Sequence, residues 1–166
     1  MTDNLPPAKK YPPVDLEQFV AASESRMTNM PILKKLGFVQ SNSTYKELKA
    51  FKPKKIGTPY YEVCFKTYDR VISLHLFPTA GGYFTIFIKR SGGKASDSIS
   101  LSRYFELYDK HSVDVECLKL RNFKGPLEEK VVQSLQCINR IFEDRFEKVL
   151  RGEEWIEVTP DYYDYK

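Results

Sequence analysis

The chain contains few of the residues that most often carry catalytic or metal chemistry. Its 166 residues include two histidines, three cysteines and one tryptophan. The sequence has no Cys-x-x-Cys pair, no cluster of histidine and cysteine ligands and no P-loop, so we expect neither a metal ion nor a nucleotide cofactor. No apolar run approaches the ~20 residues of a membrane-spanning helix, and we expect no membrane partner.

The three cysteines, Cys64, Cys117 and Cys137, fall in separate apolar segments. Their odd number does not suit a disulfide framework, and we expect buried or half-buried thiols, because unpaired cysteine packs as a small hydrophobic residue. A reactive Cys64 or Cys117 is the alternative. Since no signal peptide opens the sequence either, we expect a cytoplasmic protein.

The two histidines limit the enzymatic interpretations. His75 lies in a predicted strand and His111 in a predicted turn. A general base needs an oriented partner and a substrate within hydrogen-bond reach, and the sequence places neither beside these residues. We therefore predict that the protein is not an enzyme. An enzyme of unfamiliar type that uses His75 and a carboxylate is an alternative.

The sequence does contain a run of strand-forming segments. Residues 60–67, 71–77 and 83–89 are rich in β-branched and aromatic residues and are separated by turn formers, which predicts an antiparallel meander. Alternation along the strands predicts one buried face, formed by Val63, Phe65, Ile72, Leu74, Leu76, Phe84, Ile86 and Ile88. The other face is mixed and partly wet, and it carries Glu62, Cys64, Lys66, Ser73, His75, Phe77, Tyr83, Thr85, Phe87 and Lys89.

Helices are predicted on both sides of this run. Asp15 can cap a helix to about Thr28, and a short turn over 32–36 ends at Gly37. Ser100 can cap a helix to Tyr108, whereas 113–117 alternates like another strand. Apolar residues recur at helical spacing through Pro126–Leu150, at Leu127, Val131, Leu135, Ile138, Phe142, Phe146 and Val149. The predicted fold class is α+β, an antiparallel meander sheet packed on one face by a long C-terminal helix, with an N-terminal helix.

The chain divides into a flexible N-terminal arm (1–13), a single α+β domain (14–158) and an acidic, tyrosine-rich tail (159–166). The net charge is +4, but the two signs are separated along the sequence. Residues 1–126 carry 20 Lys and Arg against 12 Asp and Glu, whereas 127–166 carry 6 against 10. This separation favours either an intramolecular attraction or a binding surface with two charged ends.

Two segments are candidate partner-binding sites. In 45–61, lysines that can neutralise phosphates alternate with aromatic rings that can stack on bases, and the candidate residues are Lys46, Lys49, Lys52, Lys54, Lys55 and Tyr60. A lysine-protected edge strand is the alternative. In the tail, acids that steer a partner alternate with interface-forming tyrosines, and the candidates are Asp161, Tyr162, Tyr163, Asp164 and Tyr165. A tail docked on its own domain is the alternative.

The aromatic meander ("YYEVCFKTYDRVISLHLF", "GGYFTIFIK") is followed by a long helix that ends in "LRGEEWIEV". This order resembles small bacterial α+β proteins, some of which serve as immunity proteins beside polymorphic or contact-dependent toxins. The resemblance implies a cytosolic binding protein that neutralises a cognate toxin by stoichiometric occlusion. It assigns no binding residues, because immunity proteins share no diagnostic motif. A nucleic-acid-binding module that uses 45–61 is the main alternative.

Overall fold

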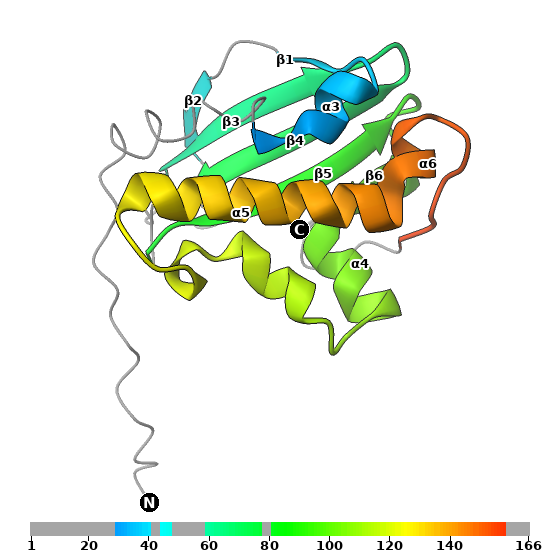
Figure 1. Ribbon diagram of the computed structural model, residues 1–166. Helices are drawn as coiled ribbons and strands as arrows, with labels where there is room; N and C mark the ends of the chain where they lie inside the picture. The colour runs from blue at the N-terminus through cyan, green and yellow to red at the C-terminus, as the bar shows by residue number, and fades with distance from the viewer. Residues whose placement is uncertain (1–28, 41–43, 48–58, 78–80, 159–166) are drawn as a thin grey trace, which may run out of the picture.

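The computed structural model describes residues 29–40, 44–47, 59–77 and 81–158 (Figure 1). Six strands form one antiparallel sheet, and they are β1 (Val39–Gln40), β2 (Thr44–Glu47), β3 (Pro59–Lys66), β4 (Arg70–Phe77), β5 (Tyr83–Arg90) and β6 (Ser98–Ser100). The order across the sheet is β1-β3-β4-β5-β6, and β2 also pairs with β3. Since β1 and β2 pair with different parts of β3, they share one edge of the sheet.

The helices lie on one side of this sheet, with α5 running across it between α3 and α4 (Figure 1). The helical elements are α3 (Pro31–Lys35), α4 (Leu101–Tyr108), α5 (Leu127–Ile141) and α6 (Glu147–Leu150), with 3₁₀ turns η2 (Ala95–Asp97), η3 (Val113–Leu118) and η4 (Leu120–Asn122). The α+β fold class and the antiparallel meander are confirmed. The predicted helix over 15–28 and the arm over 1–13 lie outside the described residues.

The core forms where the sequence pattern placed it. All eight residues predicted on the buried face of the meander are at most 2% exposed. They pack with the apolar side of α5, where Leu135 and Ile138 are fully buried. The amide of Ile32 in α3 donates to Oδ1 of Asn139 in α5 at 3.0 Å, which ties the first described helix to the long one.

Local signals in the sequence explain several helix ends. The backbone amide of Arg103 donates to Oγ of Ser100 at 3.5 Å, so Ser100 caps α4 as predicted. Gly37 follows α3 with φ of 82°, a conformation that glycine adopts without strain. The long helix begins at Leu127 beside Pro126. A π turn, η5 (Phe142–Phe146), separates α5 from α6, so the predicted helix is present with one interruption.

The prediction of a strand over 113–117 is wrong, because this segment forms the 3₁₀ turn η3. Two polar contacts stabilise the turn. The Asp114 amide donates to Oγ of Ser112 at 3.2 Å, and the Asp114 carboxylate lies 3.1 Å from the Arg145 guanidinium. Apolar–polar alternation could not reveal these contacts, since the second joins residues 31 positions apart.

The prediction of unpaired thiols is also wrong for two of the three cysteines. Cys117 of η3 and Cys137 of α5 form a disulfide, with their Cα atoms 5.9 Å apart. Their sequence separation of 20 carries no information on this distance, which depends on how η3 packs along α5. Disulfides are uncommon in reducing compartments, so the cysteines no longer support a cytoplasmic location.

The segment after α6 packs back on the domain. Nε1 of Trp155 donates to the carbonyl oxygen of Ser96 at 2.9 Å. Its ring lies near two guanidinium groups, those of Arg70 at 5.3 Å and Arg90 at 4.5 Å from the ring centroid. Val158 is 3% exposed. The last described residues are therefore part of the packed domain.

Candidate functional site

The face of the sheet opposite α5, which we call the open face, carries the most distinctive group of side chains. The described helices α3, α4 and α5 all lie on the other side (Figure 1). The strand register arranges the residues of the open face in rows that cross β3, β4 and β5. One row contains Glu62, His75 and Thr85, and the next contains Cys64, Ser73 and Phe87.

An aromatic row, formed by Tyr60, Phe77 and Tyr83, crosses one end of the open face. The rings of Tyr60 and Phe77 are stacked with centroids 5.2 Å apart, and those of Phe77 and Tyr83 are stacked at 4.9 Å. Phe77 is 4% exposed, whereas the two tyrosines that flank it are half-buried. Both tyrosines are therefore partly accessible at the surface.

His75 lies beside this row, and Nε2 of its ring is 3.1 Å from Oε2 of Glu62 on the neighbouring strand. The His75 ring also contacts two aromatic rings, with centroids 4.9 Å from Tyr60 and 5.3 Å from Phe87. Both side chains of the His75–Glu62 pair are 17% exposed. The carboxylate and the imidazole thus lie side by side within an aromatic environment.

A hollow of about 430 Å³ extends from His75 towards the turn η2. Phe87 and Lys89 form its floor on β5, and the 93–98 segment forms its wall. The ammonium group of Lys89 lies 5.8 Å from the centroid of the Phe87 ring. Lys66 of β3 lies in the same row as Lys89. This end of the open face is therefore basic.

The wall of the hollow is held in place by Asp97. Nε of Arg90 donates to Oδ1 of Asp97 at 2.7 Å, and the Lys94 amide donates to Oδ2 at 3.1 Å. The Arg90 hydrogen bond, followed by that of Lys94, lowers the pKa of the Asp97 carboxyl below its usual value of 3.8. Gly92 approaches this carboxylate so closely that a Cβ atom there would lie 2.2 Å from Oδ2.

The structure brings two of the sequence-predicted site residues together. Tyr60 belongs to the aromatic row, and Lys46 of β2 is its register partner. The other predicted residues of both segments lie outside the described residues: Lys49, Lys52, Lys54, Lys55, Asp161, Tyr162, Tyr163, Asp164 and Tyr165. Alternation along the strands predicted a mixed face with Phe77, Tyr83, Phe87 and Lys89, but nothing in the pattern identified that face as a site. The feature of the sequence that could have identified this site is the unusual number of aromatic residues on the polar side of the strands.

Among the described residues, no group of three or more His, Cys, Asp or Glu side chains is arranged to hold a metal ion. None of the described helices is both long enough and apolar enough to cross a membrane. The His75–Glu62 pair places a carboxylate beside an imidazole, and a general base also requires a reacting atom within hydrogen-bond reach. No family model, curated protein or solved structure matches this chain.

Proposed function

We propose that this protein is a stoichiometric binding protein that engages a partner protein through the open face of its sheet. The observation that carries the proposal is the aromatic row beside the His75–Glu62 pair, on the face away from the described helices. Interface cores are enriched in tyrosine and other aromatic residues. The stacking of Tyr60 and Tyr83 against Phe77 restrains the rings before binding, which reduces the entropy that a complex must lose.

The charge of the open face indicates the kind of partner. Lys66 and Lys89 lie at one end of the rows, and Lys94 lines the adjacent hollow. Glu62 is the acid of the central row, and it faces His75. A partner with acidic residues around an apolar centre is complementary to this arrangement. The resemblance to bacterial immunity proteins makes the proposal more specific. The partner is then a bacterial toxin domain, and the open face covers the active site of that domain.

The proposed place of action is the cytoplasm, as the resemblance implies. The Cys117–Cys137 disulfide counts against a reducing compartment. Thiol alkylation in intact cells, followed by mass spectrometry of the 117 and 137 peptides, tests this part of the proposal. Alkylated Cys117 and Cys137 would fit a cytoplasmic protein, whereas a protected pair would indicate an oxidising compartment.

Single-stranded nucleic acid is the second candidate, and the aromatic row favours it directly. Bases stack on aromatic side chains of sheet surfaces in several RNA-binding modules, and lysines neutralise the phosphates. Fluorescence anisotropy with a labelled oligonucleotide distinguishes the candidates. Tight binding that weakens steeply with salt would favour nucleic acid. Weak binding, unaffected by Tyr83→Ala, would leave the protein partner as the better proposal.

The proposal is tested by site-specific photo-crosslinking in the native cells. A photoreactive residue at Lys89 of the open face is compared with one at Gln136, an exposed position on α5. We expect a discrete protein adduct from position 89 and none from position 136. Co-expression with the product of the neighbouring gene should then show whether that protein is toxic and whether this chain restores growth. An adduct from position 136 alone would contradict the proposed surface.

A further inference from the structure

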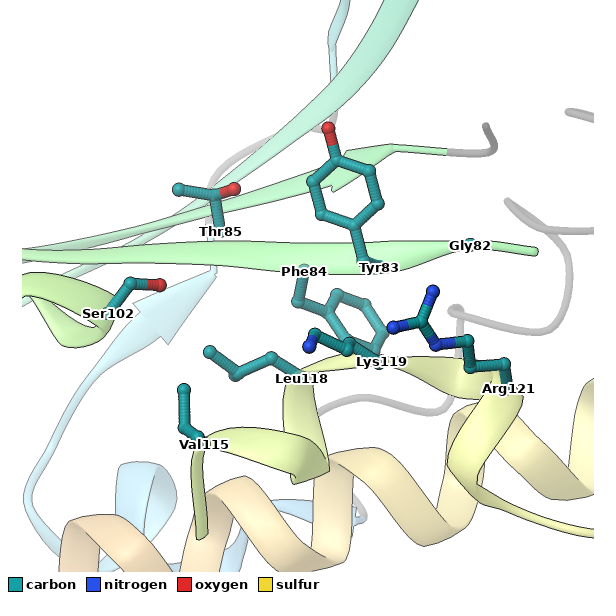
Figure 2. A pocket seen from close by; sticks show the side chains of 9 residues that line it. All are labelled: Gly82, Tyr83, Phe84, Thr85, Ser102, Val115, Leu118, Lys119 and Arg121. Atoms are coloured by element: carbon teal, nitrogen blue, oxygen red, sulfur yellow. The ribbon is translucent and has the colours of Figure 1, made fainter. Parts of the chain in front are cut away.

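A second cavity, of about 280 Å³, lies between the edge of β5 and the turns η3 and η4 (Figure 2). It exists because β5 has different partners at its two ends. Residues Phe87–Lys89 pair with β6, whereas Tyr83 forms a single bridge with Lys119, supported by a 3.0 Å hydrogen bond from the Leu120 amide to the Gly82 carbonyl. The cavity fills the space left between these two attachments.

The cavity has an apolar wall and a polar rim. Figure 2 shows Phe84 of β5 facing Leu118 and Val115 of η3, whereas Tyr83 and Thr85 point away from them on the other side of the strand. Lys119 and Arg121 line the cavity from the η4 side. A cavity of about 150 Å³ is enough to hold benzene, so this one accommodates a ring with a short substituent.

The wall formed by η3 is firmly attached to the rest of the domain. The Cys117–Cys137 disulfide joins it to α5, and the hydroxyl of Ser134 donates a hydrogen bond to the Cys117 carbonyl. Leu118 is 4% exposed and belongs to the core. The cavity is therefore a fixed feature of the fold, which suits a small-molecule site better than a transient gap would.

The charge at the rim selects the ligand. Nζ of Lys119 lies 3.4 Å from Oε1 of Glu116, and Oε2 of Glu116 accepts a hydrogen bond of 2.8 Å from Asn122. Lys119 and Arg121 both line the cavity, so its rim carries two cations, and Glu116 is the acid that the structure places beside Lys119. An anionic group on a ligand would take the place of Glu116 beside Lys119.

From this arrangement we infer that the cavity binds a small amphipathic anion, with an aromatic or short acyl body against Phe84, Val115 and Leu118 and a carboxylate or phosphate beside Lys119 and Arg121. The inference does not rest on the proposed function of the open face. Ser102, an exposed residue in the first turn of α4, lines the entrance and provides a way to block it.

The test uses the full chain and three probes in ¹H–¹⁵N NMR titrations. Phenylacetate and phenyl phosphate carry the two anionic groups, and phenylacetamide is their neutral analogue. We expect saturable shifts at Phe84, Leu118 and Arg121 with both anions, and affinities roughly fivefold higher than that of phenylacetamide. The stronger anion identifies the preferred group. Absence of saturable shifts at the solubility limit, or equal affinity for phenylacetamide, would overturn the inference.

Substitutions at the rim give opposite expectations. Lys119→Gln should weaken binding of the preferred anion several-fold without changing binding of phenylacetamide. Glu116→Gln should strengthen binding of the preferred anion. Ser102→Phe should abolish binding of all three probes. Lys130→Gln on α5 removes a positive charge that does not line the cavity and should have no effect. Thermal melts confirm that each variant is folded. Weakening by Lys130→Gln equal to that by Lys119→Gln would show that the anions respond only to overall charge, and would also overturn the inference.

Discussion

Oε2 of Glu62 lies 3.1 Å from Nε2 of His75, and the two residues occupy directly opposite positions on β3 and β4. The pair lies next to the aromatic row and at the edge of the hollow that extends to η2. It therefore joins the apolar and polar parts of the open face. Its strength determines how rigidly the centre of the proposed binding surface is held.

A double-mutant cycle measures this pair. We expect His75→Ala and Glu62→Ala to be coupled by ~0.2–1 kcal/mol in the free energy of unfolding, the range for cross-strand side-chain pairs. Urea denaturation of the two single variants and the double variant at pH 6 gives the coupling. Additive effects would show that the two side chains do not interact in solution.

The core prediction concerns α5. Leu135 and Ile138 are fully buried against the sheet, so Leu135→Ala and Ile138→Ala should each lower the free energy of unfolding by ~2–5 kcal/mol. Asp144→Ala, at an exposed position of the π turn, is the control and should change it by less than ~0.5 kcal/mol. Chemical denaturation provides all three values. Core changes below ~0.5 kcal/mol would mean that α5 is not packed on the sheet.

The disulfide should contribute measurably to stability. It closes a loop with a sequence separation of 20, and the chain-entropy model gives about 3 kcal/mol for loops of this size. Cys137→Ser should therefore lower the unfolding free energy by roughly that amount. Cys64→Ser is the matched control, because Cys64 takes no part in the disulfide. Equal denaturation midpoints for the native chain with and without reductant would contradict the pairing of Cys117 with Cys137.

The Asp97 carboxylate should make the domain sensitive to acid. Its hydrogen bonds to Arg90 and to the Lys94 amide hold its pKa below the usual value in the folded state. A carboxyl whose pKa is lowered by folding contributes stability above its unfolded pKa of about 4 and loses it as the pH falls through the folded pKa. Thermal melts from pH 7 to pH 2 should show a shallower acid-side decline for Asp97→Asn than for the native chain. Parallel declines would show that Asp97 is not linked to folding.

The meander was predictable because its information is local. Alternation from Val63 to Ile88 identifies the buried face, and the turn formers between the strands fix their antiparallel order. The long helix was predictable for the same reason, since its apolar spacing extends over more than five turns. A π turn changes this spacing so little that the sequence did not reveal it.

The errors came from contacts between distant parts of the chain. Val113–Leu118 forms a 3₁₀ turn held by Arg145, and Cys117 meets Cys137 only because that turn packs along α5. The open face was similarly hidden. Tyr60, Phe77 and Tyr83 come from three strands, and only the register of the sheet places their rings in one stack.

The open face as the binding surface is tested most directly by two charge reversals of the same kind. Lys89→Glu changes the open face, whereas Lys130→Glu changes α5 on the opposite side. Binding to the partner recovered by crosslinking is measured by isothermal titration calorimetry. The account predicts that Lys89→Glu raises the Kd at least about tenfold while Lys130→Glu leaves it within about twofold. An unchanged Kd for Lys89→Glu together with a large increase for Lys130→Glu would contradict it, because the partner would then bind the helical side.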